Sequence, residues 1–447
     1  MYEKFPIEGK WWLPDTPNNA VAGRLEYSEQ SGPKLVLLGT LESQSKHGLD
    51  LHEYQIILGR THEVSEITLM GCKGTGSHGT LGGETAKETY RPTVMFLGKH
   101  FTTQNEIQFK EIYADITHLN TWADFRAITH QYEDNTDIIR ATRLPSRNLT
   151  DCEGYSLRVF ASLENSLDDY SSKVVQSTSL VCSFKNPTPL IEYWPVLRDF
   201  QNLLSILVDQ PCFPSEIYGI PPNDVRRVTI IRRMAFHKPS KALHPLELLL
   251  PLDKMGDRAT ELIRNWLQKA SILRPIHNLA LGTIYNESIY AENRFLSITQ
   301  ALESYHRRIK GGNDRPLAEH QARLTTILNA APAEHKDWLN LKLSHSNEPH
   351  LKKRLESLCA QFPNYSRMIN ERTPDFLTRV VKTRHYLTHF DENNKKGSFA
   401  SSELYFPSEK LRILFWICML TEIGYSNTEA ETIALNHYEF ARILKFN

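Results

Sequence analysis

The change in hydrophobic spacing near residue 257 constrains the fold of this chain most. Before it, short runs of β-branched and aromatic residues alternate with turn-forming segments, which is typical of strands. After it, apolar residues recur every three or four positions, which is typical of amphipathic helices. The sequence therefore predicts an α+β multidomain protein, with a β-rich domain at 1–255 and a helical domain at 256–447.

The first part should form antiparallel sheet. Its strand-like runs lie at 21–27, 34–41, 53–60, 63–70, 92–98, 105–116, 155–163 and 179–184. So many short strands in one stretch of chain favour a sandwich or a partly closed barrel. Helical spacing first shows at Ile191–Leu207, inside a mixed segment that precedes the boundary.

The second part should form a helical bundle. Its helical segments lie at 258–273, 292–309, 316–331, 351–362, 374–390 and 408–420. Thr373 and Ser408 are the expected N-caps of the last two, because a hydroxyl before the first turn accepts a free backbone N–H. The segment 408–420 is apolar almost all round, which predicts a central core helix.

Charge and cysteine usage narrow the class of protein. The chain has 52 Lys and Arg against 52 Asp and Glu, but residues 256–447 alone carry 26 against 21, a net of +5. That excess allows a basic patch on the helical domain. The sequence has no apolar run near the roughly 18 residues of a membrane span, no leader-like start and no CxxC pair among its six cysteines. We expect a cytoplasmic protein with no membrane partner.

Several common active-site motifs are missing. The sequence contains no HExxH, no GxSxG and no cluster with metal-ligand spacing, and its glycine-rich stretch Gly71–Gly83 lacks the Gly-Lys-Ser/Thr of a phosphate loop. The glycine-rich stretch therefore predicts a hairpin loop between strands. We expect no metal and no cofactor.

The segment Arg379–Phe390 is the most informative for function. On a helical wheel with Phe376 at 0°, its apolar residues span about −40° to 140°, and Arg384 falls at about 80°, inside the apolar stripe. His389 lies about 140° further round. One interpretation is structural: Arg384 snorkels or meets a carboxylate, and His389 interacts with the helix dipole.

The other interpretation is metal-independent RNA cleavage. A histidine can take the 2′-hydroxyl proton because its pKa lies near neutrality. An arginine can stabilise the charge that develops on the phosphate. The angle between Arg384 and His389 is compatible with this chemistry if the helix ends near His389, or if two copies combine their groups. Basic residues that could hold the RNA backbone are Arg379, Lys382, Lys395 and Lys396.

The segment Arg384-His385-Tyr386-Leu387-Thr388-His389 matches the R-x4-6-H signature of HEPN ribonucleases. The context TRHYLTHFD resembles the HEPN domain of ApeA-like anti-phage proteins. The segment Arg294–Arg308 resembles an earlier helix of that domain, and GKWWLPDTPNNAVAGRLEY resembles the β-rich N-terminal domain of the family. The resemblance covers nearly the whole chain in the same domain order.

The resemblance implies an all-α HEPN bundle that forms a homodimer and cleaves RNA to shut down an infected cell. Carried over, Arg384 stabilises the phosphate and His389 acts as general base or acid. The position after the arginine is commonly Asn in this family but is His385 here, which takes the orienting role or adds a second proton-transfer group. Glu303 is a weaker auxiliary candidate, since it can also pair with Arg307 at i+4.

The β-rich domain would then sense a phage-derived trigger or restrain the nuclease. The alternative function is a non-catalytic helical bundle that binds a partner or RNA without cleaving it. A binding-only protein has no need for both Arg384 and His389. A metal-dependent nuclease is disfavoured, because the sequence lacks an acidic cluster.

Overall fold

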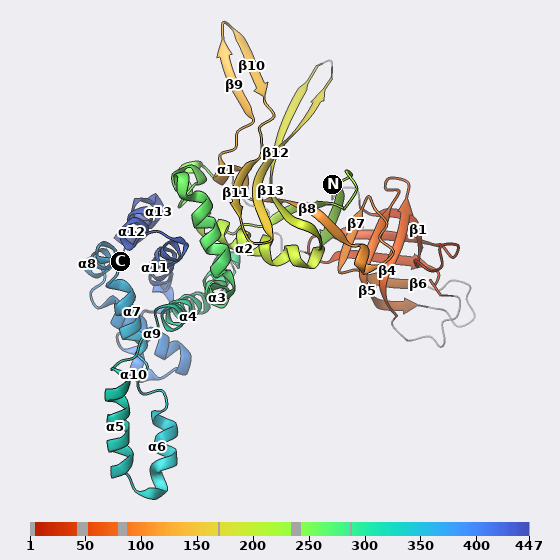
Figure 1. Ribbon diagram of the computed structural model, residues 1–447. Helices are drawn as coiled ribbons and strands as arrows, with labels where there is room; N and C mark the ends of the chain where they lie inside the picture. Colours follow the sequence, from red (N-terminus) through yellow and green to blue (C-terminus); the bar gives the residue numbers. More distant parts are fainter. Residues whose placement is uncertain are drawn as a thin grey trace. The chain divides into compact units, whose positions relative to one another are not determined.

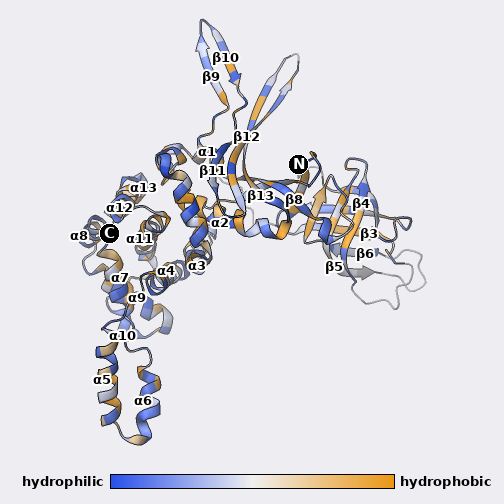
Figure 2. Cartoon of the chain, in the orientation of Figure 1, coloured by the Kyte–Doolittle hydropathy of each residue, from blue (hydrophilic) through white to orange (hydrophobic). Residues whose placement is uncertain are grey.

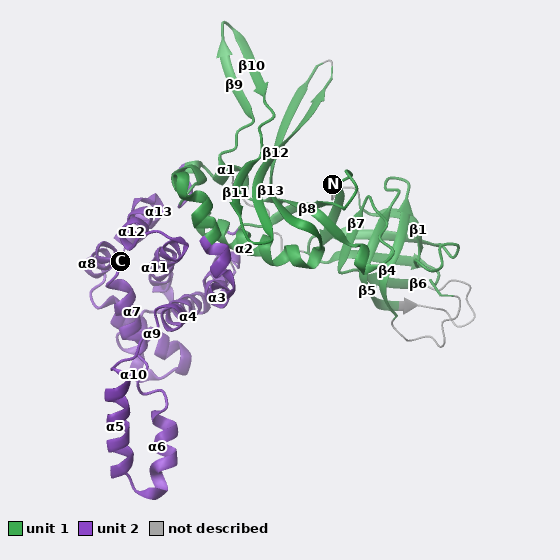
Figure 3. Cartoon of the chain, in the orientation of Figure 1, with its two compact units in different colours: residues 1–208, 212–245, 250–264 green, residues 209–211, 246–249, 265–447 purple. Residues whose placement is uncertain are grey.

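The computed structural model describes residues 5–42, 52–78, 87–168, 170–233, 243–286 and 288–446. The chain forms two compact units, which Figure 3 colours separately. Unit 1 comprises residues 1–208, 212–245 and 250–264. Unit 2 comprises residues 209–211, 246–249 and 265–447.

Unit 1 is rich in strands, which Figure 1 traces in order. They are β1 (Ile7–Trp12), β2 (Val21–Ser28), β3 (Gly32–Leu38), β4 (Glu53–Thr61), β5 (Ile67–His78), β6 (Lys87–Arg91), β7 (Val94–Leu97), β8 (Gln108–Ile116), β9 (Ile128–Glu133), β10 (Thr136–Ala141), β11 (Arg147–Asp151), β12 (Tyr155–Leu167), β13 (Ser172–Pro189), β14 (Pro214–Ile220) and β15 (Val228–Arg232). Each of the runs predicted as strands overlaps a strand of the structure, although the run 63–70 enters β5 only at Ile67 and the run 105–116 enters β8 only at Gln108. The hairpin loop predicted for the glycine-rich stretch Gly71–Gly83 is wrong for Gly71–His78, because they belong to β5, which pairs with β6. The rest of the stretch lies outside the described residues.

Six of these strands close into a barrel. Antiparallel pairing runs from β1 to β2, β3, β6, β5 and β4 and back to β1. Alternate side chains such as Trp11, Leu25 and Leu35 point inward and are fully buried. Gly59 sits against Trp11, where a Cβ would lie 2.2 Å from the indole ring, so only glycine fits. The closed barrel replaces the partly closed one that the sequence predicts.

The other strands extend the same sheet away from the barrel, in the order β7, β15, β14, β8, β13, β12 and β11. Helix α2 (Leu190–Val208) packs on β13 and β8, and its Tyr193 hydroxyl donates to the Phe109 carbonyl at 2.8 Å. β9 and β10 form a separate two-stranded ribbon. The short helical segments here are α1 (Leu119–Ala123), η2 (Gln104–Glu106), η3 (Pro245–Glu247) and η4 (Leu252–Arg258).

Unit 2 is helical. Its helices are α3 (Ala259–Tyr285), whose first residues belong to unit 1, α4 (Ala291–Tyr305), the π-helical turn η5 (His306–Lys310), α5 (Leu317–Ala330), η6 (Ala333–His335), α6 (Lys336–Leu343), α7 (Leu351–Cys359), α8 (Pro363–Arg372), α9 (Phe376–His389), α10 (Glu392–Lys395), η7 (Ser401–Glu403), α11 (Tyr405–Ile423), α12 (Asn427–Asn436) and α13 (Tyr438–Lys445). Figure 2 shows hydrophobic and hydrophilic residues side by side along α5 and α6, as amphipathic helices require. Nearly every residue of α11 is buried. The predicted α+β organisation, β-rich and then all-α, is confirmed.

The two predicted N-caps are wrong. α9 begins at Phe376, not at Pro374, and its N-cap residue Asp375 makes no side-chain capping bond. The Thr373 hydroxyl instead accepts a hydrogen bond from Lys410 Nζ at 3.1 Å. α11 begins at Tyr405, so Ser408 lies inside the helix, where its hydroxyl donates to the Leu404 carbonyl. A tertiary partner and an extra helical turn account for the two differences.

Candidate active site

Helix α9 carries the whole R-x4-H segment. Phe376, Val380 and Thr383 form its buried line, because residues three and four apart share one face of a helix. The helix ends at His389, where Phe390 takes a left-handed conformation with φ of 52°. Arg384 and His389 therefore lie in the last turns of one helix. A helix that ends at His389 is one condition under which these side chains, about 140° apart around the axis, can share a site.

Arg384 is held by a carboxylate. Its side chain is 28% exposed, and its guanidinium nitrogen Nη2 lies 3.9 Å from Glu303 Oε2 on α4. Glu303 also lies 3.9 Å from Arg307, which in turn lies 2.9 Å from Glu348. Alternating charges thus run across unit 2 to Arg384. Glu303 is the i+4 partner of Arg307, as the sequence allows, and it also faces Arg384, a contact that no sequence pattern assigns to it.

The structure brings the two histidines of α9 together. The rings of His385 and His389 have centroids 6.4 Å apart and planes 22° from parallel, because the residues are one helical turn apart. Burial lowers the pKa of His385, and the charges of Arg384 and His389 lower it further, while Glu303 opposes the shift. His389 is exposed at the end of the helix. No hydrogen bond between Arg384 and His389 is found among the described residues.

This arrangement can transfer protons and stabilise an anion. The cation of Arg384 lies close enough to His385 to lower the pKa of that histidine, and the His385 ring faces the ring of His389. The side of His385 toward water is open because the residue is only half-buried. The described part of the chain has no group of three or more His, Cys, Asp or Glu residues that could hold a metal ion. The side chains on α9 therefore suit acid–base chemistry on an anionic substrate.

Of the four predicted RNA-backbone residues, Arg379 and Lys382 lie one turn apart on one side of α9, and Lys395 and Lys396 follow the end of that helix. Arg379 pairs with Glu403 at 3.4 Å and lies over the Phe399 ring at 3.9 Å, some 140° around the helix from Arg384. Lys382 Nζ donates to the Lys396 carbonyl at 3.5 Å, and Lys395 pairs with Glu392 at 3.1 Å. The structure gathers Lys382, Lys395 and Lys396 near the C-terminal end of α9, and Arg379 lies one turn nearer the start of the helix, where it pairs with Glu403.

Sequence reasoning missed the far side of the charge network. His306 on the π-helical turn η5 is buried, with its Nδ1 3.3 Å from Arg354 Nη1, and Arg354 pairs with Glu348 at 3.2 Å. Burial lowers the pKa of His306, and the charges of Arg354 and Lys310 add to the effect. Glu303 and Glu348 are 45 positions apart, and no spacing rule relates such distant residues. Only the i+4 pair Glu303–Arg307 could therefore be predicted from the sequence.

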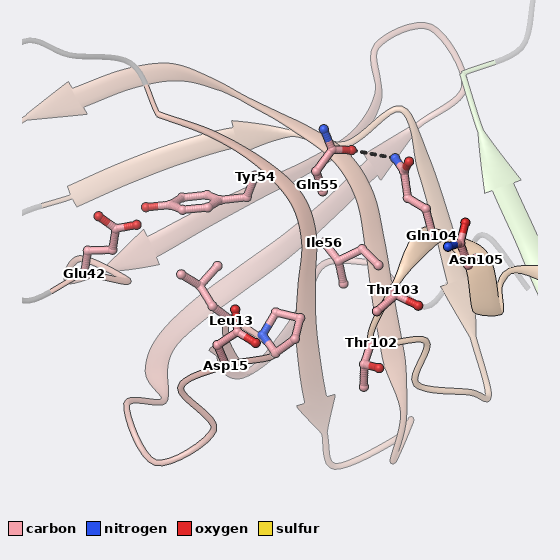
Figure 4. A pocket seen from close by; sticks show the side chains of 11 residues that line it. Leu13, Asp15, Glu42, Tyr54, Gln55, Ile56, Thr102, Thr103, Gln104 and Asn105 are labelled. Carbon is pink, nitrogen blue, oxygen red and sulfur yellow. Dashed lines mark hydrogen bonds between the residues drawn. The ribbon is translucent and has the colours of Figure 1, made fainter.

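A separate cavity of about 590 Å³ lies in unit 1 (Figure 4). Asp15, Glu42 and Tyr54 line one side, and Gln104 donates to Gln55 on the other. Burial and the neighbouring charge of Glu42 raise the pKa of Tyr54 to about 12. The lining is polar and acidic, and it contains none of the predicted site residues.

Comparisons with known proteins agree with the architecture. The family model described as ApeA N-terminal domain 1 matches residues 6–266, and the model described as Apea-like HEPN matches residues 296–429. Searches of curated proteins and of solved structures give no match. None of the described helices is long and apolar enough to cross a membrane.

The matched segments contain every residue of the candidate site on α4 and α9. HEPN domains are generally associated with RNA cleavage, and they typically dimerise and bind RNA. The N-terminal model alone covers more than half of the chain. The chain belongs to the ApeA family, with ApeA N-terminal domain 1 followed by an Apea-like HEPN domain.

Proposed function

We propose that this chain is a metal-independent endoribonuclease of bacterial anti-phage defence, with Arg384 and His389 as its catalytic pair. The observation that carries the proposal is the end of α9, where Arg384 faces Glu303 and lies near His385, whose ring faces that of His389, all inside the HEPN segment. Chemistry at such a site needs no metal, since the arginine supplies the positive charge and the histidines move the protons.

The reaction follows from these groups. The RNA 2′-oxygen attacks the adjacent phosphorus and loses its proton to an imidazole. The bond from phosphorus to the 5′-oxygen breaks, and that oxygen takes a proton from an imidazolium. Arg384 stabilises the extra negative charge on the phosphate oxygens between these steps. The products are a 2′,3′-cyclic phosphate and a 5′-hydroxyl.

The lowered pKa of His385 bears on its role. Because burial and the nearby cations disfavour its charged form, His385 is neutral at pH 7 and can accept a proton. His389 is then free to act as the acid, or as the base with His385 orienting it. Lys382, Lys395 and Lys396 hold the RNA backbone beside the helix end.

We also propose that the HEPN domain forms a homodimer along α9. Next to its buried line, the half-exposed residues Leu377, Val381 and Arg384 form a flank that unit 2 leaves partly open. An apolar flank around the catalytic arginine suits a second copy of the same helix, because a twofold contact places like residues face to face. The two R-x4-H segments would then share one cleft.

The β-rich N-terminal domain would sense the trigger. Its cavity with Asp15 and Glu42 (Figure 4) offers negative charge, and the domain as the sequence divides it is net acidic. Either feature suits a cationic trigger of phage origin or a mask for a basic cleft. The division at 255/256 and the cytoplasmic location remain parts of this proposal.

The test is RNA cleavage by purified protein in EDTA. Wild type should leave 2′,3′-cyclic phosphate ends, and Arg384→Ala and His389→Ala should each lose about 100-fold or more in rate, the contribution of such groups elsewhere. Arg323→Ala on exposed α5 is the control and should cleave normally. Circular dichroism would check that the variants remain folded.

Two results would contradict the proposal. Cleavage that persists in folded Arg384→Ala and His389→Ala would place the site elsewhere. If wild type cleaves no RNA either as purified protein or in phage-infected cells, the result supports the alternative function. The chain would then be a helical bundle that binds a partner or RNA without cleaving it.

A further inference from the structure

Unit 2 has a cavity of its own, lined by none of the residues Glu303, Arg384, His385 and His389. Its volume is about 430 Å³, within the range of small-molecule sites. It is enclosed where α8 ends and where α9 and α11 begin, with η7 at its rim. Two long helices thus direct their N-terminal ends toward one space, and the dipole at such ends favours negative charge.

The decisive residue in this cavity is Lys410. Its side chain is 1% exposed, and its Nζ donates to the Thr373 hydroxyl at 3.1 Å. Three other buried charged residues of α11 have partners of opposite charge: Glu409 and Arg412 pair with each other, and Glu422 pairs with Lys269. Among the described residues, Lys410 has no carboxylate partner. A buried ammonium without a counter-ion is costly, and a bound anion would remove that cost.

The surrounding charges reinforce this point. Burial lowers the pKa of Lys410 to about 8, and the nearby charge of Arg372 contributes to the shift. Arg379 lines the opposite wall and pairs with Glu403. Three cations against one carboxylate leave a net positive cavity.

The walls are also aromatic. The rings of Phe376 and Phe399 lie 5.9 Å apart at 55°, and the guanidinium of Arg379 covers Phe399 at 3.9 Å. Phe406 completes the apolar side of the cavity. Aromatic faces and an arginine plane are the surfaces on which nucleic-acid bases stack. The cavity therefore combines a place for an anion with a place for a flat ring.

We propose that this cavity binds a nucleoside phosphate, with the phosphate at Lys410 and Arg372 and the base against the Arg379 guanidinium and the half-exposed Phe406 ring, since Phe376 and Phe399 are buried. The ligand is either a free mononucleotide or one nucleotide of an RNA chain. The proposal does not depend on cleavage at α9, because the cavity uses other residues at the other end of that helix.

Calorimetric binding to the full chain tests this proposal. The ligands are AMP, GMP, CMP and UMP, a 2′-O-methyl tetranucleotide with a 5′-phosphate, and inorganic phosphate. Wild type should bind at least one nucleotide ligand more tightly than phosphate, and salt should weaken the binding. Saturation by mononucleotides identifies a free-nucleotide site, and saturation by the tetranucleotide alone identifies an RNA subsite.

Lys410→Met and Arg372→Gln should each weaken the binding at least about tenfold, the usual cost of a lost charged hydrogen bond. Arg372 is exposed, so Arg372→Gln should fold even if Lys410→Met does not. Arg367→Gln is the matched control, since Arg367 lies on the same helix, is 67% exposed and faces Glu371. Wild type that binds no nucleotide at millimolar concentration overturns the proposal, as does binding that neither cavity variant weakens.

Discussion

At the scale of single residues, Arg384 shows what a helical wheel can predict and what it cannot. The sequence places this cation inside an apolar stripe, and the structure finds it half-buried with Glu303 as its partner. The wheel predicts that Arg384 either snorkels or meets a carboxylate, but it cannot say which carboxylate. Glu303 lies 81 positions earlier on another helix, so only tertiary structure could select it.

Glu303→Gln tests Glu303 as a positioning residue. Its charge favours the protonated form of His385, so its removal should lower the pKa of that histidine further. If His385 accepts the proton in its neutral form, the acid limb of the cleavage rate should move to lower pH. Arg384 also loses a partly exposed ion pair, which should reduce kcat/KM by up to about fivefold, equivalent to about 1 kcal/mol.

The measurement is a pH–rate profile of RNA cleavage for the variant and wild type. Glu319→Gln is the control, since Glu319 of α5 forms an exposed ion pair with Arg315 and, in the described part of the chain, pairs with no residue of the candidate site. An acid limb that stays in place or moves to higher pH would count against the role of His385, although the protein folded normally.

At the scale of elements, α11 combines a strongly apolar sequence with several buried charges. Arg412 forms hydrogen bonds to Glu409, at 2.8 Å from Nε, and to Asp209, and all three residues are buried. The two carboxylates raise the pKa of Arg412, which keeps the guanidinium charged. Such a cluster is stable only when complete, because each charge depends on the others.

Arg412→Met should lower the free energy of unfolding by about 3–5 kcal/mol, the usual cost of leaving a buried charge unpaired. Burial raises the pKa of Asp209 while the charge of Arg412 lowers it, so removal of the cation should raise this pKa further and the unfolded state should ionise first as pH rises. The loss should therefore be larger at pH 7 than at pH 4. Urea denaturation at both pH values measures it.

Arg442→Met is the matched control, because Arg442 pairs with Glu439 on the surface and should cost less than about 1 kcal/mol. The variant that also carries Asp209→Asn and Glu409→Gln should recover much of the stability. An Arg412→Met protein as stable as the control would show that the cluster contributes little.

The elements that could be predicted are those with a strong local pattern. The eight expected strands and the six expected helices are present. They could be predicted because alternation and three-to-four spacing are patterns of residues close together in the sequence. The missed strands, such as β1, β6 and β11, are short or contain glycine and charged residues, and the sheet holds them through neighbours distant in sequence. Closure of the barrel depends on such pairs, above all β5 with β6 and β1 with β4.

At the scale of the whole molecule, the compact units do not follow a single cut in the sequence. Unit 2 includes Asp209–Pro211 and Leu246–Leu249 as well as residues 265–447. A fragment that begins at 256 would lack Asp209, a buried partner of Arg412. Experiments on the proposed nuclease are therefore best made with the full chain.

The proposed dimer can be tested through Val381. This residue lies on the half-exposed flank of α9 beside Arg384, so Val381→Asp would place a charge in the twofold contact. Light scattering should show a dimer for wild type and a monomer for the variant, with loss of RNA cleavage. Val225→Asp is the matched control, because Val225 is 91% exposed in unit 1.

A dimer also allows Arg384 of one copy to serve His389 of the other, and co-expression of two inactive chains distinguishes this arrangement. If each site combines residues from both copies, a dimer of Arg384→Ala with His389→Ala keeps one intact site. Random pairing should then restore about a quarter of wild-type activity. If each site lies within one copy, every site in the mixture lacks a group and no activity returns.

A Val381→Asp protein that remains dimeric and active would exclude the α9 flank as the contact.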